Sequence, residues 1–212
     1  MYDIIETKER LLADNDAAAE KTRAFMRSGG IFFVNLMGSP GAGKTTTLLR
    51  TIEELKDKLS LGIMEADIDS DVDAVKIKEA GARSIQLHTG GMCHLDATMT
   101  GQGLDAFGAD DLDLVILENV GNLVCPAEFD TGACKNACIV SVPEGDDKPL
   151  KYPLMFQVAD IVLVNKMDTA PYFDFDIEKF KENVKMRHPD IPVLEISAKT
   201  GEGITAWTDW LQ

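Results

Sequence analysis

The chain has 212 residues, 45% of them hydrophobic and 27% charged, and its formal net charge is −15 at pH 7. This length fits one sizeable α/β domain, and the acidity argues against a nucleic-acid partner because most of the surface would repel phosphate. The sequence contains no apolar stretch long enough to span a membrane, and its N-terminus is polar and charged. We therefore expect a cytoplasmic protein without a membrane partner, in which cysteines are metal ligands or core residues rather than disulfides.

Apolar runs alternate with amphipathic helical patterns along the chain. Residues 1–30 favour helix and predict an N-terminal helical extension of one or two helices, ended by Gly29 and Gly30. The alternation over 31–212 predicts a mostly parallel sheet of roughly seven strands with helices on both faces. Strands are expected at 31–37, 61–66, 84–88, 113–119, 138–142, 160–165 and 192–197, and helices at 44–59, 71–81, 94–106, 149–158, 175–187 and 203–211.

The segment from Gly38 to Thr45 matches the phosphate-binding pattern G-x-x-x-x-G-K-[ST] between a predicted buried strand and a predicted helix. Backbone amides of such a loop surround phosphate oxygens, Lys44 would reach the β- and γ-phosphates, and the Thr45 hydroxyl would hold Mg²⁺. We predict a P-loop NTPase fold that binds a nucleoside triphosphate. The loop contacts are expected to come from Gly38, Ser39, Gly41, Ala42, Gly43, Lys44, Thr45 and Thr46.

Two later loops indicate guanine as the base. Asn165, Lys166 and Asp168 form an N-K-x-D pattern after a strand, and the Asp168 carboxylate can accept hydrogen bonds from both guanine N1–H and the N2 amino group. Asn165 would brace the loop, and the aliphatic part of Lys166 would lie against the base. Ser197, Ala198 and Lys199 resemble the S-A-K loop of GTPases, whose backbone amides meet the guanine O6. The predicted nucleotide is GTP.

Acidic residues at two strand ends are candidates to complete the Mg²⁺ site. Asp67 ends the second predicted strand, with Asp69, Asp71 and Asp73 as nearby alternatives. Glu118 ends the fourth strand and begins Glu118-Asn119-Val120-Gly121, which resembles the D-x-x-G loop of GTPases with Glu in place of Asp. Because Mg²⁺ keeps several waters, the longer Glu118 side chain is expected to act through water.

Cys93 and His94 stand side by side in a glycine-rich loop after the third strand, and Cys125 follows the fourth. Thiolate and imidazole ligands suit Ni²⁺ or Zn²⁺ rather than Mg²⁺. The spacing leaves two alternatives open: His94 could begin a helix, and Cys125 could be a small core residue. The remaining cysteines and histidines, Cys134, Cys138, His88 and His188, are expected to be structural.

The position of Cys125 relates this cluster to the nucleotide. It lies four residues beyond Gly121, so even an extended chain keeps the two within about 14 Å. A loop that tightens on GTP would therefore move a thiolate. Three protein ligands leave a tetrahedral zinc site one ligand short, and a two-fold dimer could bring two such sets together.

Segments 38–45, 91–96, 118–127 and 143–153 together resemble the HypB family of nickel-insertion GTPases for [NiFe]-hydrogenase. The Cys93-His94-Leu95-Asp96 order separates the chain from the related UreG family. The resemblance implies a SIMIBI-class G domain over 31–212 that dimerises with GTP, with Cys93, His94 and Cys125 holding Ni²⁺ or Zn²⁺ at the dimer interface. It also implies that Lys148 or Lys151 reaches the nucleotide of the partner. Residues 1–30 lack Cys and His, so the family's N-terminal nickel-storage tract is not expected.

These features predict a GTP-hydrolysing nickel chaperone that works with other hydrogenase maturation proteins. Lys44, Thr45, Asp67 and Glu118 are its predicted catalytic and Mg²⁺-binding residues. No glutamine or arginine identifies itself as water-positioning or charge-stabilising, so slow turnover is expected. The alternatives are a urease-type nickel chaperone and a metal-binding scaffold with little GTPase activity.

Overall fold

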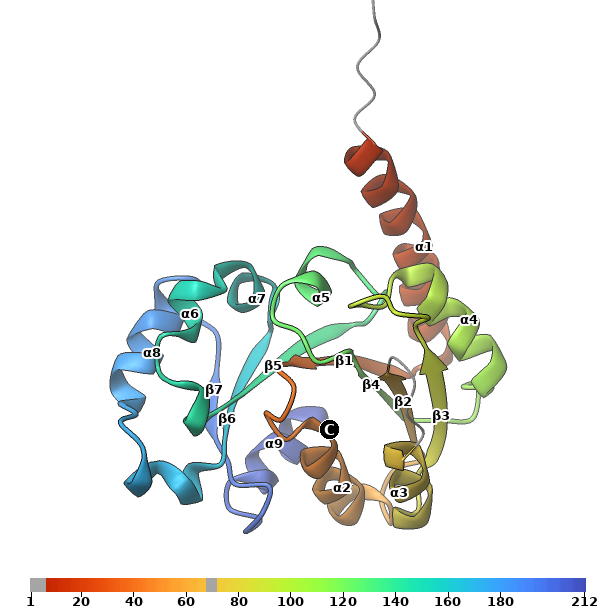
Figure 1. The fold of residues 1–212 in the computed structure, drawn as a ribbon. Coiled ribbons are helices and arrows are strands. Elements are labelled where there is room, and N and C mark those ends of the chain that lie inside the picture. The colour runs from red at the N-terminus through yellow and green to blue at the C-terminus, as the bar shows by residue number, and fades with distance from the viewer. Residues whose placement is uncertain (1–6, 68–71) are drawn as a thin grey trace, which may run out of the picture.

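The computed structural model describes residues 7–67 and 72–212. In this part of the chain a seven-stranded sheet has the order β3-β2-β4-β1-β5-β6-β7 (Figure 1). Every neighbouring pair is parallel, so the predicted α/β sheet is confirmed and is wholly rather than mostly parallel. Its strands are β1 (Phe32–Gly38), β2 (Leu61–Asp67), β3 (Arg83–His88), β4 (Leu114–Glu118), β5 (Lys135–Ser141), β6 (Ile161–Asn165) and β7 (Val193–Glu195).

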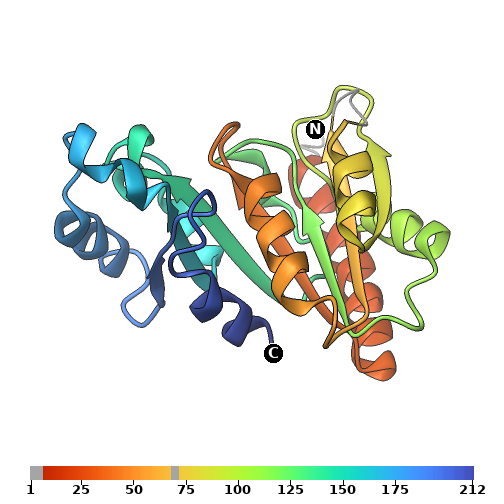
Figure 2. The same cartoon turned by 90° about the horizontal axis from the view of Figure 1, so that it is seen from below.

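Helices cover both faces of this sheet (Figures 1 and 2). Side chains that alternate along β1 point to opposite faces, as the period of two requires. The helices are α1 (Thr7–Gly29), α2 (Lys44–Leu55), α3 (Val72–Ala80), α4 (Ala97–Phe107), α5 (Cys125–Glu128), α6 (Lys148–Lys151), α7 (Pro153–Val158), α8 (Ile177–Lys185) and α9 (Ile204–Leu211), with short 3-10 turns at η1 (Val142–Glu144) and η2 (Met167–Tyr172). Val34 and Leu36 pack toward α2, α3 and α9, whereas Phe33 packs toward α1 and α4, and Met37 toward α7 and α8.

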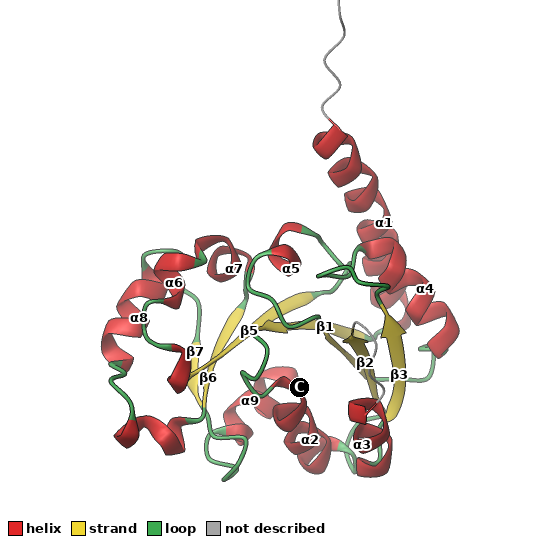
Figure 3. Cartoon of the chain, in the orientation of Figure 1, coloured by secondary structure: helices red, strands yellow, loops and turns green. Residues whose placement is uncertain are grey.

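The N-terminal segment forms one long helix, α1, beside α4 at one end of the sheet (Figure 3). Its Arg23 pairs with Asp130 at 2.6 Å, and the Asn15 side chain donates to the Asp130 carbonyl and accepts from the Ala97 amide. These bonds attach α1 to the loop before β5 and to the start of α4. Among the described residues, no helix combines the length and apolar character needed to cross a membrane.

Several elements differ from the sequence expectations, and three of these differences have a clear physical reason. The helix expected at 149–158 is divided at Tyr152, because the residue before Pro153 is disfavoured in the helical region. The helix expected from residue 94 begins at Ala97, because the Asp96 side chain accepts from the Met99 amide and caps it. The short helix α5, which begins at Cys125, was not predicted, since four residues carry no readable periodicity.

Candidate nucleotide and metal site

The phosphate-binding loop follows β1 and leads into α2, as predicted. Gly41 and Gly43 have φ angles of 75° and 100°, in the left-handed region that favours glycine. A side chain on Gly43 would also collide with the Asn165 amide, so this position needs glycine for two reasons. The Lys44 ammonium lies inside the loop and donates to the carbonyls of Gly38 and Ser39, each at 3.3 Å.

A cavity of about 430 Å³ opens above this loop. It is large enough for the phosphates, and two lysines outside the loop, Lys76 on α3 and Lys166, bring positive charge to its wall. Lys76 was not singled out from the sequence, because it lies on α3 without a recognised motif. The full lining is Gly41, Gly43, Lys44, Thr45, Thr46, Leu49, Lys76, Glu118 and Lys166.

The two loops expected to select guanine lie side by side at the ends of β6 and β7. The Asn165 side chain donates to the Ala42 carbonyl at 2.9 Å and accepts from the Ala198 amide at 3.0 Å, so it joins the phosphate loop to the S-A-K loop. The Asp168 carboxylate accepts from the Ser197 hydroxyl at 2.7 Å. The structure thus brings these residues together and holds the Asp168 carboxylate in one orientation.

Lys166 and Arg50 add two further connections. Lys166 has a φ of 63° and donates to the Gly41 carbonyl at 2.6 Å, which lays its aliphatic part beside the loop. Arg50 on α2 donates to the carbonyls of Ala198 and Lys199, both at 3.0 Å. Arg50 could not be identified from the sequence, because an arginine on a helix carries no motif signal and its partners lie 148 and 149 positions away.

Two of the residues expected to bind Mg²⁺ meet at the end of β4. The Thr45 hydroxyl donates to Glu118 Oε1 at 3.0 Å, and both residues line the cavity above the phosphate-binding loop. Asp67 is the last residue of β2, and its side chain lies outside the described part of the structure. Asp69 and Asp71 also lie outside the described residues.

Lys148 and Lys151 are both on α6, away from the lining of their own cavity. The Lys151 ammonium pairs with Asp147 at 2.6 Å, which raises the pKa of Lys151 and lowers that of Asp147. Lys148 lies over the Tyr152 ring, 5.8 Å from its centroid. Within one protomer, these contacts hold both lysines near the surface of α6.

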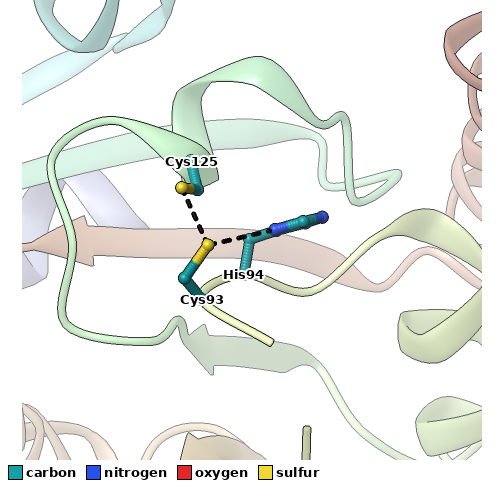
Figure 4. A group of neighbouring side chains, drawn as sticks. All are labelled: Cys93, His94 and Cys125. Atoms are coloured by element: carbon teal, nitrogen blue, oxygen red, sulfur yellow. Dashed lines mark hydrogen bonds between the residues drawn. The ribbon is translucent and has the colours of Figure 1, made fainter. Parts of the chain in front are cut away.

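Cys93, His94 and Cys125 come together as a candidate soft-metal site (Figure 4). Their ligand atoms all lie within 4.8 Å of one another, with 2.8 Å between the two sulfur atoms and 3.8 Å between Cys93 Sγ and His94 Nδ1. The His94 ring stacks on Phe129 at 3.9 Å, which orients the imidazole. Two details differ from the structural alternatives: His94 lies before the capped start of α4 and does not begin it, and Cys125 is half-buried beside Cys93.

The protonation states within the cluster follow from its surroundings. The hydrogen bond to Cys125 raises the pKa of the Cys93 thiol, whereas burial lowers the pKa of His94. A lowered pKa leaves the imidazole neutral at neutral pH, which is the form that binds metals. Burial raises the pKa of Cys138, which lies in the core, so its thiol is unsuited to that chemistry. Cys134 packs against the core, as expected for a structural residue.

The fold and the strand-end loops define a nucleotide-binding protein of the P-loop class. The family model described as "CobW/HypB/UreG, nucleotide-binding domain" matches residues 32–195. The chain belongs to this family, and its similarity over nearly its whole length places it with the HypB hydrogenase maturation factors.

Three relatives illustrate the similarity. The hydrogenase maturation factor HypB of Rhizobium leguminosarum bv. viciae is 44% identical over 99% of this chain and 70% of its own. The crystal structure of Helicobacter pylori HypB in complex with nickel has a TM-score of 0.89 at 36% identity and covers 93% of both chains. That of Archaeoglobus fulgidus HypB has a TM-score of 0.88 at 40% identity, covering 94% of this chain and 98% of its own.

Proposed function

We propose that this protein is a GTP-hydrolysing metallochaperone that delivers nickel for [NiFe]-hydrogenase maturation. The observation that carries the proposal is the convergence of Cys93, His94 and Cys125 in the loops after β3 and β4, at the edge of the sheet where Glu118 lines the cavity. Two sulfurs and an imidazole suit Ni²⁺ or Zn²⁺ as cargo. The nickel complex of the Helicobacter pylori relative supports nickel.

The nucleotide half of the proposal rests on the loop geometry. Asp168 selects guanine, Lys44 neutralises the β- and γ-phosphates, and Thr45 and Glu118 hold Mg²⁺ with Asp67 as a further contributor. When bound, Mg²⁺ would neutralise phosphate charge during hydrolysis. The described residues that line the cavity include neither glutamine nor arginine, so intrinsic turnover is slow.

A homodimer completes the metal site in this proposal. Cys93 is exposed, and three ligands from one chain leave a four-coordinate ion one ligand short. A two-fold axis beside Cys93 supplies ligands from a second copy, and GTP favours this dimer. In it, Lys148 or Lys151 reaches the partner's nucleotide. The proposal divides the chain into a helical extension (1–30) and a SIMIBI-class G domain (31–212), acting in the cytoplasm with other hydrogenase maturation proteins.

Phosphate release tests the catalytic part. We expect slow release from GTP and none above background from ATP, and Lys44→Ala should abolish the GTP signal. Lys56→Ala is the matched control, since Lys56 caps the far end of the same helix. Equal rates with GTP and ATP, or activity retained by Lys44→Ala, would refute this part.

Metal binding tests the chaperone part. Ni²⁺ affinity is measured by titration in the GDP form and in the form with a non-hydrolysable GTP analogue, with light scattering to follow the dimer. Coupling between the sites requires that the two affinities differ. Equal Ni²⁺ affinities would leave a guanine-nucleotide switch without a transport role.

A further inference from the structure

One backbone carbonyl connects the phosphate-binding loop to the turn that carries Cys125. Gly38 O accepts from the Lys44 ammonium at 3.3 Å and from the Asn122 backbone amide at 3.0 Å. Bound phosphates would attract Lys44 away from this carbonyl, because they carry more negative charge than a neutral oxygen. The Asn122 amide is therefore bonded to a carbonyl, that of Gly38, whose other partner is expected to change when nucleotide binds.

The Asn122 side chain extends this connection to the metal ligand. Its Oδ1 accepts from the Val124 amide at 2.8 Å and from the Cys125 amide at 3.4 Å, and so organises the first turn of α5. Asn122 does not line the triphosphate cavity. Its side chain fixes the direction of Cys125 relative to Gly38 without touching the nucleotide.

Asn119 connects the same segment to the loop that carries the other two candidate ligands, Cys93 and His94. It follows Glu118, is only 1% exposed, and its Oδ1 accepts from the Leu95 amide, directly after His94, at 3.4 Å. Its Nδ2 donates to Asn35 Oδ1 at 3.0 Å inside the sheet. The loop of Cys93 and His94 is thereby attached to the segment that would hold Mg²⁺.

We propose that Asn119 and Asn122 are positioning residues that attach the two halves of the metal site to the nucleotide-sensing segment, residues 118–122. Asn119 attaches the loop that carries Cys93 and His94, and Asn122 attaches the turn that carries Cys125. A shift of Asn122 with the nucleotide, relative to Asn119, which Asn35 holds in the sheet, changes the distance between the thiol of Cys125 and the other two ligands, and so changes the affinity for Ni²⁺. This inference rests on the proposed function, which it deepens by naming the groups that transmit the change.

The test compares the ratio of the Ni²⁺ dissociation constants in the GDP·Mg²⁺ and GTP-analogue·Mg²⁺ forms of the full chain. Coupled sites in proteins typically give ratios of about 5–150. Asn122→Ala should bring the ratio at least about fivefold closer to one. The affinity for the GTP analogue should stay within about twofold of wild type, because the lost contact lies outside the nucleotide cavity. Asn122→Asp should restore the ratio, because a carboxylate oxygen still accepts from Val124 and Cys125. The near-ultraviolet thiolate-to-Ni²⁺ absorption reports whether both thiols remain ligands.

Asn15→Ala is the matched control. Asn15 also joins two segments through its side-chain amide, but the partners of these bonds, Ala97 and Asp130, both lie outside residues 118–122. It should weaken thermal stability and keep the wild-type ratio. Asn119→Ala is the second test variant and should bring the ratio closer to one, as Asn122→Ala does.

Four results would overturn the inference. They are a wild-type ratio in Asn122→Ala, a wild-type ratio in Asn119→Ala, a ratio in Asn15→Ala that moves equally close to one, or a ratio in Asn122→Asp that does not return to the wild-type value. If wild-type protein itself has a ratio of one, the coupling in the proposed function fails first and the inference fails with it. A wild-type ratio far from one that both asparagine variants retain refutes the inference alone.

Discussion

The sulfur atoms of Cys93 and Cys125 lie 2.8 Å apart, although 32 positions separate the two residues. The reason is the strand order, because Cys93 follows β3 and Cys125 follows β4, and both strands neighbour β2 in a parallel sheet. Parallel strands deliver their following loops to one edge, where ligands of α/β proteins bind. The candidate metal site and the cavity above the phosphate-binding loop therefore lie at the same edge of the sheet.

Removal of either thiol should weaken metal binding. Cys93→Ala and Cys125→Ala are each expected to lower Ni²⁺ affinity by more than about tenfold, because removing a direct ligand should cost at least as much as removing a residue that only orients one. Metal analysis after equilibrium dialysis measures the effect. Cys134→Ala, which changes a thiol packed against the core, should bind as wild type does. Equal binding by all three variants would contradict the assigned ligands.

Substitution of Asp168 should change base selection. In Asp168→Asn the amide keeps one acceptor but loses the charge, so GTP affinity should fall by about tenfold to a hundredfold, in line with the energies of hydrogen bonds to charged groups. Xanthosine triphosphate should bind better than to wild type, because its C2 carbonyl can accept from the new amide. Competition against a fluorescent guanine nucleotide measures both changes. Unaltered GTP affinity would show that Asp168 does not contact the base.

Arg50 should position the S-A-K loop without taking part in phosphate chemistry. Its guanidinium holds the carbonyls of Ala198 and Lys199. Arg50→Ala should raise KM for GTP by about threefold to tenfold with kcat unchanged, as expected when only ground-state binding is lost. Glu53→Ala is the control, since it removes only the exposed partner of Arg50. A fall in kcat at constant KM would assign Arg50 a different role.

Cys138 should make stability fall at alkaline pH. Burial raises the pKa of its thiol above the ordinary value of 9.0, so the folded chain keeps a proton that the unfolded chain releases. Stability from this group is present below pH 9.0 and is lost as the pH rises above it. Thermal unfolding measured from about pH 8 to about pH 10 should show a steeper decline in stability for wild type than for Cys138→Ala. Parallel slopes would contradict the assignment.

Thiol labelling provides an independent measure of the burial of Cys138. Iodoacetamide should modify the exposed Cys93 in the folded protein and Cys138 only on unfolding. Rapid labelling of Cys138 in the folded protein would show that this part of the core opens.

Short motifs predicted the phosphate-binding loop and the loops expected to select guanine from sequence alone. Gly38 to Thr45 and Asn165 to Asp168 could be read directly, because each turn is built by adjacent residues and lies between a strand and a following helix or turn. The alternation of apolar strands and amphipathic helices likewise determined a parallel α/β sheet, since burial on both faces leaves a recognisable pattern.

Only the tertiary structure decided which distant residues meet. Cys125 could have been a core residue until the strand order placed it against Cys93, and Arg50 had no assigned role until α2 packed beside the S-A-K loop. The same holds for Asn119 and Asn122, whose bonding partners belong to other loops. Such contacts depend on the order of strands in the sheet and on helix packing, which are set by the sum of many weak interactions and leave no local signal in the chain.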